Sequence, residues 1–449
     1  MKYHIVTLGC PKNVVDSEGM DGILAGEGHI HVASTIDADV IIVNTCSFIA
    51  AARDETFDVL CDLGSGKREG QRLIAAGCMA QSHADLVSRV AGVDGILSTQ
   101  QWTRIGELVG ERTSTNGRQV PVIGLDLVAK PPQPSYADWR TAQIRRTRST
   151  PSAYLKISDG CNLRCAFCTI PTFKGDMASK SVGAILAEAQ ELVAHGVREI
   201  VLVAQHLTDY GHDLKLTDGL STLLDEICQV IPANVWLRLM YAYPHGISER
   251  LIDVMASRPQ IVKYLDLPLQ HAHPDTLRRM HRPPDTDRTR GIIRDLRDAM
   301  PDIALRSTFI VGFPGETSAE FKGLLAFLDE VRLDRVGVFR YSQESGTHAA
   351  TLPERVRPQV IEKRWHELMQ LQQGISRERS HRWLGRTIDV LVEGHGSADD
   401  GRLITLGRSF RDAPEVDGQV FVWGKSPMGE IVTVRVTQAT DYDLWGEIV

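Results

Sequence analysis

Six of the eight cysteines in this 449-residue chain are placed where they could do chemistry. Three of them, Cys161, Cys165 and Cys168, lie on one short segment with the spacing C-x3-C-x2-C. Three thiolates on one loop can hold three irons of a cubane 4Fe–4S cluster, which normally takes four cysteines. The fourth iron would lack a protein ligand, and an open metal position is usual in catalytic sites. The alternative is a structural zinc site closed by a distant residue, although no second pair at zinc-knuckle spacing is present.

The other three cysteines, Cys10, Cys46 and Cys78, each follow an apolar run that is typical of a buried parallel strand. If the strands share one sheet, the three thiols emerge at its carboxyl edge, where open α/β sheets bind ligands. The pattern predicts a second cluster with an unoccupied iron, and ordinary small buried residues are the alternative. The runs are residues 5–8, 40–43 and 73–76.

Two glycines support this interpretation. Gly9 and Gly77 directly precede Cys10 and Cys78, and glycine lets the backbone turn tightly and approach a ligand closely. The remaining cysteines, Cys61 and Cys228, lie within helical patterns, and we expect both to pack as buried apolar residues.

The surrounding pattern predicts three domains and a linker. Residues 1–116 alternate strand and helix and predict a small doubly wound α/β domain. Residues 117–146 contain the structure-breaking Pro131-Pro132 and Pro134 and a locally basic end, Arg145-Arg146, continued by Arg148, and we expect a solvated connector. Residues 147–377 show about six βα units, which favours a partial TIM-like (β/α)6 barrel. Residues 380–449 show short strands between Gly and Asp turns, which fits an OB-like β-barrel of about five strands.

The expected elements of the two larger regions follow from apolar periodicity. In the barrel region we predict strands at 154–157, 199–204, 235–240, 264–267, 307–311 and 335–339, and helices at 182–195 and 319–331. In the C-terminal region we predict strands at 387–392, 403–406, 419–423 and 431–437. In the first domain, helices are expected at 14–25 and 50–63.

Composition excludes several classes of protein. Hydrophobic residues make up 43% and charged residues 24% of the chain, and the formal net charge is −7. These values are typical of a globular protein and not of a general nucleic-acid binder. No apolar run approaches the roughly 20 residues of a membrane helix, and we do not expect residues 1–9 to form a secretory signal. We therefore expect a cytoplasmic protein without membrane contact.

The Cys161–Cys168 loop resembles the signature of the radical S-adenosylmethionine (SAM) superfamily, whose fold is a partial TIM barrel. The resemblance implies that the open iron chelates the amino and carboxylate groups of SAM, and that reduction gives a 5′-deoxyadenosyl radical. Together with Cys10, Cys46 and Cys78, the chain resembles the methylthiotransferase family over its whole length. In that family the N-terminal triad holds a second 4Fe–4S cluster that delivers sulfur, and a TRAM domain follows the radical-SAM barrel.

Three stretches resemble the branch of this family that modifies an aspartate of a small-subunit ribosomal protein. They are residues 8–13, 264–271 and 441–446. A physical argument agrees, because residues 380–449 hold seven Lys or Arg and eleven Asp or Glu, a net charge of −4. An acidic barrel repels tRNA and attracts a basic protein, since polyphosphate binding needs Lys and Arg. A merely soluble acidic surface is the alternative.

By the same resemblance, SAM lies across the carboxyl ends of the barrel strands. Gln205 and Gln270 follow predicted strands and are expected to contact it. Arg238 lies within a strand, where an unpaired guanidinium would be costly, so it either binds a carboxylate of the cofactor or forms a buried pair.

Two positions depart from the family pattern. Lys174-Gly175 stands where Arg-Gly is expected; lysine keeps the charge but loses the planar fork, so we do not expect it to clamp a carboxylate. His206 stands where an aspartate is expected. His271 and His273 lie near the same rim, and we expect structural or solvated roles for both.

The sequence thus predicts an enzyme that adds a methylthio group to the β-carbon of an aspartate in a basic small-subunit ribosomal protein, free or within the ribosome. It would use two SAM molecules, one as methyl donor and one as radical source, because an unactivated C–H bond has no useful acid–base route. An electron donor such as flavodoxin or ferredoxin and a sulfur donor are implied partners, and tRNA is not expected. The alternatives are a tRNA adenosine methylthiotransferase and a non-catalytic, zinc-containing ribosome-binding module.

Overall fold

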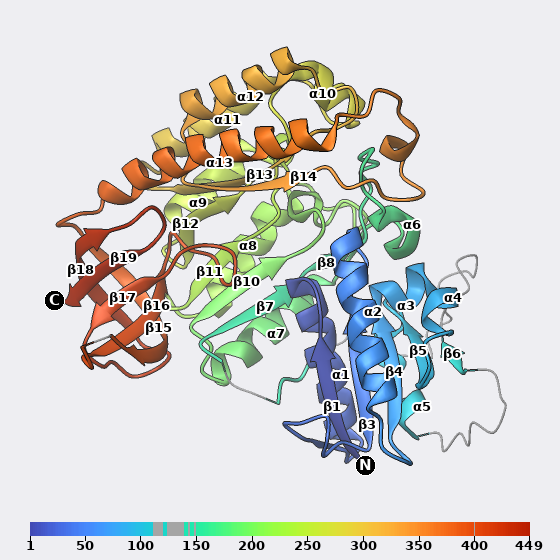
Figure 1. Ribbon diagram of the computed structural model, residues 1–449. Helices are drawn as coiled ribbons and strands as arrows, with labels where there is room; N and C mark the ends of the chain where they lie inside the picture. Colours follow the sequence, from blue (N-terminus) through green and yellow to red (C-terminus); the bar gives the residue numbers. More distant parts are fainter. Residues whose placement is uncertain (111–119, 124–138, 142–143, 148–149, 399) are drawn as a thin grey trace. The chain divides into compact units, whose positions relative to one another are not determined.

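The computed structural model of the chain (Figure 1) describes residues 1–110, 120–123, 139–141, 144–147, 150–398 and 400–449. These residues form two compact units. The first unit comprises 1–148, 154–164 and 168–191, and the second comprises 149–153, 165–167 and 192–449. Most of the predicted linker, 117–146, lies outside the described residues, and so do Pro131, Pro132, Pro134 and Arg148.

The first unit contains a six-stranded parallel sheet with the order β2-β1-β3-β4-β5-β6. All six residues of β3 and β5 are buried, and the run VIIV at the start of β3 is typical of a strand covered on both faces. The three strands predicted here are present as β1, β3 and β4, and the sequence analysis missed β2, β5 and β6. The bounds are β1 (Lys2–Thr7), β2 (Ile30–His31), β3 (Val40–Thr45), β4 (Arg72–Gly77), β5 (Val93–Ser98) and β6 (Val122–Ile123).

Helices connect these strands, and two further helices, α6 and α7, follow after residue 169. Both predicted helices are present, as α1 and α2. The helices are α1 (Pro11–Gly26), α2 (Ala50–Ser65), α3 (Cys78–Ser82), α4 (Ala84–Val87), η1 (Trp102–Arg104), α5 (Ile105–Gly110), α6 (Ile170–Lys174) and α7 (Val182–Ala194). The short strands β8 (Ser158–Asp159) and β9 (Ala178–Ser179) pair in antiparallel fashion.

Arg146 corrects the expectation of a solvated connector at the end of the linker. Its side chain is only 5% exposed. The guanidinium donates to Glu18 at 2.8 Å, to Glu188 at 2.9 Å and to the Tyr154 carbonyl at 2.6 Å. A charge this deeply buried is stable only when it is paired, and these two carboxylates supply the pairing. The prediction was wrong at this residue because its partners are distant in sequence.

The second unit is built on a mostly parallel sheet with the order β14-β13-β12-β11-β10-β7, whose last strand begins in this unit at Ser152. All six predicted strands are present, which confirms the partial-barrel prediction. They are β7 (Ser152–Lys156), β10 (Glu199–Val203), β11 (Trp236–Leu239), β12 (Ile261–Asp266), β13 (Ala304–Val311) and β14 (Arg335–Arg340).

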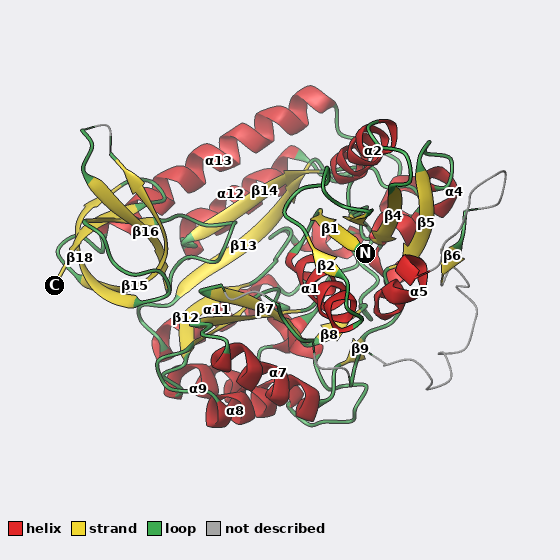
Figure 2. Cartoon of the chain, turned by 90° about the horizontal axis from the view of Figure 1, so that it is seen from below, coloured by secondary structure: helices red, strands yellow, loops and turns green. Residues whose placement is uncertain are grey.

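Helices accompany these strands. The N-terminus of α12 has a capping box, in which Thr317 and Glu320 satisfy each other's backbone N–H groups. Helix α13 lies beside β14 (Figure 2), and the Trp365 indole donates to the Val338 carbonyl at 2.9 Å. The helices are η2 (Leu207–Asp209), α8 (Gly219–Val230), η3 (Pro244–Gly246), α9 (Glu249–Ser257), α10 (Pro274–Arg279), α11 (Thr286–Ala299), α12 (Ser318–Val331), η4 (His348–Thr351) and α13 (Pro358–His381).

The C-terminal residues form a closed barrel with the order β15-β16-β17-β19-β18. Its interior is filled by valines such as Val390, Val422 and Val434, all fully buried. The five-stranded prediction is confirmed, although β19, with the sequence LWGEI, was not located in advance. The strands are β15 (Thr387–Ser397), β16 (Leu403–Ser409), β17 (Val420–Trp423), β18 (Ile431–Ala439) and β19 (Leu444–Ile448).

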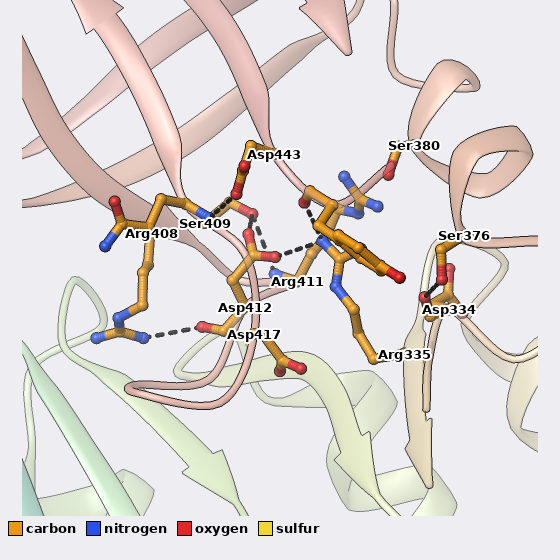
Figure 3. A network of polar contacts seen from close by, with 12 residues as sticks. Asp334, Arg335, Ser376, Ser380, Arg408, Ser409, Arg411, Asp412, Asp417 and Asp443 are labelled. Carbon is orange, nitrogen blue, oxygen red and sulfur yellow. Dashed lines mark hydrogen bonds and ion pairs between the residues drawn. The ribbon is translucent and has the colours of Figure 1, made fainter. Parts of the chain in front are cut away.

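A buried polar network fixes this barrel to the amino-terminal half of the strands in the same unit (Figure 3). Arg335, the first residue of β14, donates to Asp412 at 2.8 Å, and the Ser409 hydroxyl donates to the same carboxylate at 2.7 Å. The Tyr264 hydroxyl donates to Asp417 at 2.7 Å. Burial would raise the pKa of Asp412, but Arg335 and Arg411 hold it below its usual value. The interface is therefore polar and its charges are paired, although Arg335 Nε and Nη1 and Arg411 Nη1 and Nη2 have no hydrogen-bond partner among the described residues.

The network bears on the acidity of the barrel. Two of its arginines, Arg408 and Arg411, and two of its aspartates, Asp412 and Asp417, have side chains that are almost completely buried. Their two positive and two negative charges cancel, so the acidic excess of the C-terminal region comes from its remaining charged residues. Among the described residues, no helix combines the length and apolar character needed to cross a membrane.

Candidate iron–sulfur and SAM site

The N-terminal cysteines gather at one edge of the first sheet, as predicted. Cys10 precedes α1 and follows β1, Cys46 directly follows β3, and Cys78 opens α3 directly after β4. These strands are neighbours in the order β1-β3-β4 and are parallel, so their carboxyl ends meet. A Cβ added to Gly9 would lie 2.7 Å from the Cys46 Sγ, which places that thiol against the residue before Cys10.

Two asparagines that the sequence analysis missed support this edge. The Asn13 amide donates to the Leu8 carbonyl at 2.8 Å and to the Thr45 carbonyl at 3.0 Å, and its oxygen lies 3.8 Å from the Cys78 Sγ. The Asn44 amide donates to the Asn13 carbonyl at 2.8 Å. Only their position, close to a strand end or to Cys10, could have signalled this role.

Gly77 turns the chain sharply between β4 and α3. Its φ is +91°, and an added Cβ would lie 2.3 Å from the Asn44 side-chain oxygen and 2.8 Å from the Thr45 carbonyl. A side chain here would be strained and would also clash with backbone. The glycine therefore lets Cys78 approach the other two thiols.

The environment of these thiols fits a metal cluster. Burial raises the pKa of Cys78 to about 12, and the nearby Cys10 and Cys46 raise it further when charged. Burial also raises the pKa of Cys46. The two buried thiols, Cys46 and Cys78, need bound cations to become thiolates, because metal binding displaces their protons. An iron–sulfur cluster supplies such cations.

The Cys161–Cys168 loop is anchored at several points. In the first unit, Gly160 has a φ of +81°, and the Cys161 N–H donates to the Gly175 carbonyl at 3.1 Å. In the second unit, the backbone of Ala166 donates to the Met280 carbonyl at 2.9 Å and accepts from the Ala349 N–H at 2.7 Å. The loop is thus held in place by segments on both sides of the cysteines.

Arg282 is a site residue that the sequence analysis missed. Its guanidinium lies 3.6 Å from the Cys165 Sγ, donates to the Pro268 carbonyl at 2.7 Å and lies over the Tyr243 ring at 4.6 Å from the centroid. A fixed cation beside a thiolate stabilises its charged form. The sequence around Arg282 offers no motif that signals this contact.

Lys174 has two acidic neighbours. Its ammonium lies 2.9 Å from an Asp159 carboxylate oxygen and 3.9 Å from one of Asp16, so it does contact carboxylates. Burial would lower the pKa of Lys174, but Asp159, Cys78 and Asp16 raise it above its usual value. The lysine is therefore a permanent cation. These are contacts of a single ammonium and not the two-pronged clamp of an arginine, and the sequence around Lys174 does not signal either carboxylate.

Gln205 and Gln270 lie at the carboxyl ends of strands in the second unit, where SAM contacts are predicted. Gln205 follows β10, and Gln270 follows β12 with a φ of +70°, which is unusual for a residue with a side chain. Tyr241, just after β11, has a φ of +64°. Strained backbone at neighbouring strand ends is typical of binding sites. The SAM contact itself stays a prediction for both glutamines.

Arg238 has a different environment. It is fully buried in β11, donates to Glu199 at 2.7 Å and also donates to the carbonyls of Ser409 and Phe410 at 3.2 and 2.7 Å. Burial alone would raise the pKa of Glu199, but Arg238 and Arg408 lower it to about 2, so the carboxylate stays charged. These contacts favour the buried-pair alternative for Arg238 over cofactor binding.

A pocket lies near these strand ends in the second unit. Its lining includes Tyr243, His245, Leu269, His271, Arg282 and Thr286. His206 packs edge-on against the Tyr243 ring, and neither of its ring nitrogens has a hydrogen-bond partner among the described residues. Burial lowers the pKa of His206 to about 4; the nearby Asp209 opposes this shift and Arg282 adds to it, so the ring is neutral near pH 7.

The other residues singled out in sequence have structural surroundings. His271 is buried beside Glu316 at 3.4 Å, and His273 caps α10, as expected. Cys228 is buried in α8, and burial raises its pKa to about 11. Cys61 is partly buried against the core of the first sheet. None of these four contributes a group to the two cysteine triads.

Comparison with family models divides the chain in the same order. Residues 2–98 match the uncharacterized protein family UPF0004, residues 155–328 the radical SAM superfamily, and residues 384–449 the TRAM domain. Fold and site together define a radical SAM enzyme that carries an N-terminal α/β domain and a C-terminal TRAM barrel, as the sequence predicted.

Curated relatives narrow this class. The chain is 71% identical over its whole length to the ribosomal protein uS12 methylthiotransferase RimO of Chloroflexus aurantiacus, of which it covers 99%. It is 66% identical to that of a Roseiflexus species and 41% identical to that of Geobacter sulfurreducens, covering 97% and 98% of them. The chain belongs to this family of methylthiotransferases. The cofactors of the family are SAM and two 4Fe–4S clusters.

Solved structures agree on the fold. The radical SAM methyltransferase TsrM of Kitasatospora setae, solved with cobalamin and a 4Fe–4S cluster, matches with a TM-score of 0.55 at 15% identity, covering 78% of this chain and 76% of that chain. The cobalamin-dependent enzyme OxsB matches with a TM-score of 0.51 at 13% identity, covering 83% of this chain and 56% of that chain.

Proposed function

We propose that this enzyme adds a methylthio group to the β-carbon of an aspartate in ribosomal protein uS12, giving 3-methylthioaspartate. Two SAM molecules are used, one as methyl donor and one as radical source. One observation carries the proposal: the chain has two separate cysteine triads, and its full-length relatives are named ribosomal protein uS12 methylthiotransferase. The relatives named here do not favour the tRNA-modifying alternative or the zinc-containing module.

In this proposal the two triads have different tasks. Cys161, Cys165 and Cys168 hold the cluster that binds SAM, and Cys10, Cys46 and Cys78 hold the auxiliary cluster. When bound, these groups supply the one-electron chemistry that breaks an unactivated C–H bond and the sulfur that replaces the hydrogen. The protein residues bind and orient SAM and the two clusters. Gln205 and Gln270 contact SAM from the carboxyl ends of their strands, and Arg282 fixes the Cys165 side of the loop.

The partners follow from charge and chemistry. The acidic excess of the C-terminal barrel favours a basic protein such as uS12, free or within the ribosome, and disfavours tRNA. A one-electron donor such as flavodoxin or ferredoxin and a sulfur donor complete the reaction. A ribosomal substrate places the enzyme in the cytoplasm, and neither tRNA nor a membrane is among the proposed partners.

The test is reconstitution of the full chain under anaerobic conditions with iron, sulfide, SAM and a reductant. Purified uS12 and bulk tRNA are offered in separate reactions, and both are then analysed by mass spectrometry. We expect a methylthio group on one aspartate of uS12 and none on tRNA. A mark found only on tRNA would overturn the proposal, and a colourless protein without iron would support the zinc-containing alternative.

A further inference from the structure

Four buried charges of the first unit form a compact group, here called the charge tetrad. Its cations are Lys156 and Lys174, and its anions are Asp16 and Asp159. The side chains of Lys156, Lys174 and Asp16 are at most 3% exposed and that of Asp159 is 11% exposed. Lys156 contacts Asp16 directly and Asp159 at 3.3 Å. Each lysine therefore lies between both carboxylates.

The tetrad is built from residues that lie close to members of both cysteine triads in the chain. Asp159 precedes Cys161 by two residues, and Asp16 belongs to α1, which begins directly after Cys10. Lys174 ends α6, which packs against α3, the helix that opens at Cys78. Asn13 and Asp16, three residues apart on α1, lie 3.8 Å from the Cys78 Sγ and 3.9 Å from the Lys174 ammonium, respectively. The tetrad, the three N-terminal cysteines, Cys161 and Cys168 all belong to the first unit, whereas Cys165 and its neighbours Ala166 and Phe167 belong to the second. One lysine thus contacts the flank of one triad and acts on a member of the other.

The charges of the tetrad balance, with two positive and two negative groups. Removing one of them leaves an uncompensated charge in a buried, poorly screened environment, where it acts strongly on its neighbours. Reduction potentials of iron–sulfur clusters depend on net charge and on hydrogen bonding around the ligands. A lysine that is fixed by two carboxylates keeps its charge at one place, close to the Cys78 sulfur.

We propose that Lys174 is a positioning residue that raises the reduction potential of the auxiliary cluster by holding a fixed cation beside Cys78. This inference rests on the proposed assignment of Cys10, Cys46 and Cys78 as its ligands. One-electron reduction takes the cluster core from the 2+ to the 1+ state, adds one negative charge and breaks no bond. A nearby cation stabilises the added charge, and a nearby carboxylate opposes it. Lys174 and Asp159 therefore have opposite effects.

The experiment isolates the auxiliary cluster. The full chain with Cys161, Cys165 and Cys168 all replaced by alanine is reconstituted anaerobically and titrated with dithionite while the reduced cluster is followed by electron paramagnetic resonance. Lys174→Met, Lys174→Arg and Asp159→Asn are introduced into this background. Lys180→Met is the matched control, because Lys180 is equally buried but pairs with Glu188, which is not a member of the tetrad.

We expect Lys174→Met to shift the equilibrium toward the oxidised cluster by about tenfold, which is about 59 mV for a one-electron couple. Asp159→Asn shifts it in the opposite direction, and Lys174→Arg and Lys180→Met stay close to the parent. Opposite shifts from one buried pair cannot come from general loss of structure. If Lys174→Met does not retain iron, the other two variants decide the outcome. The proposal then requires a raised potential in Asp159→Asn and a parent-like potential in Lys174→Arg.

The outcomes separate the two proposals. A parent background that binds no iron overturns the ligand assignment and this inference with it. A background that binds about four irons per chain, as expected for one cubane, but keeps one potential in all variants overturns this inference alone. Equal shifts of the same sign in Lys174→Met and Asp159→Asn also overturn it, since they would report disruption instead of charge.

Discussion

The two cysteine triads are built in opposite ways. Cys161, Cys165 and Cys168 lie within eight residues of one another on a single loop, whereas Cys10, Cys46 and Cys78 come from the ends of three neighbouring strands. The loop triad needs only a short segment with fixed ends. The strand triad exists only if β1, β3 and β4 pair in the observed register. A metal site can thus depend on local sequence or on the whole fold.

The difference extends to the supporting residues. The strand triad is supported by the two asparagines Asn13 and Asn44 and by the sharp turn at Gly77, all of which are buried. The loop triad is supported by backbone hydrogen bonds and by one arginine, Arg282. We therefore expect the strand triad to fail when the packing of the first sheet is changed, and the loop triad to respond mainly to changes in its own segment.

The largest effect is expected from removing one thiol of each triad. Cys46→Ala and Cys165→Ala each lower the iron content from about eight to about four per chain, since each cubane holds four irons, and both abolish methylthiolation of uS12. They differ in SAM cleavage, because Cys46→Ala still releases 5′-deoxyadenosine under reducing conditions and Cys165→Ala does not. Iron analysis and chromatography measure these quantities. Equal loss of SAM cleavage in both variants would contradict separate roles.

A smaller effect is expected from the glycine beside each triad. Gly77→Ala would place a Cβ 2.3 Å from the Asn44 oxygen, and Gly160→Ala would place one 2.3 Å from the Asp176 carbonyl, both at positive φ. We expect each substitution to cost about 1–3 kcal/mol. Gly77→Ala loses auxiliary iron and Gly160→Ala loses iron from the loop triad. Gly183→Ala, where nothing lies within 4 Å of the new Cβ, is the control.

The next prediction concerns Arg282, which supports only the loop triad. Arg282→Met removes the guanidinium 3.6 Å from the Cys165 Sγ. We expect a 10–100-fold loss of affinity for iron at this triad, as is typical when a residue that orients a ligand is removed. Competition with a chelator measures it, and auxiliary iron serves as the internal reference. Arg278→Met, at a surface ion pair with Asp275, should leave both sites unchanged.

The smallest effect is expected at His206, which packs against the Tyr243 ring beneath Arg282. Its folded pKa of about 4 lies below the ordinary value, so the unfolded chain takes up the proton first as the pH falls. The contribution of the neutral His206 ring to the free energy of unfolding is present above about pH 6.5 and is lost progressively toward pH 4. Between pH 7 and 5 we expect the free energy of unfolding to fall by about 2 kcal/mol from this group.

Urea unfolding of the parent and of His206→Asn at both pH values measures this quantity. The asparagine has no proton to gain, so its stability should depend less on pH by that amount. Identical pH dependence in the two proteins would show that the ring is not kept neutral by burial.

Much of the fold was predictable because its signals are local. Buried strands such as Val40–Thr45 have continuous apolar sequences, and a thiol after each of three such runs can be placed at a sheet edge without a structure. The cluster loop was predictable from spacing alone. The strand β19 was missed because LWGEI has only a short apolar pattern and a central glycine.

The rest depended on contacts between residues that are distant in sequence. Arg146 was predicted to be solvated, but Glu18 and Glu188 bury it. The acidic neighbours of Lys174 were not predicted, because one of them, Asp16, approaches it from α1. Arg238 pairs with Glu199 on the neighbouring strand and with backbone of the C-terminal barrel. Charge patterns along the chain contain no information about such partners.

The position at which the C-terminal barrel is attached determines how far a substrate bound to it must extend to reach the opposite ends of the strands. The barrel is fastened near the first residues of β10 and β14, at Glu199 and Arg335, whereas Gln205 and Gln270 lie past the opposite ends of the strands. The eight-residue strand β13 spans about 26 Å at about 3.3 Å per residue. A polypeptide gripped by the barrel must therefore extend at least eight residues or so along the outside of the sheet before its target side chain arrives, which favours a long, pliable loop over a compact helix.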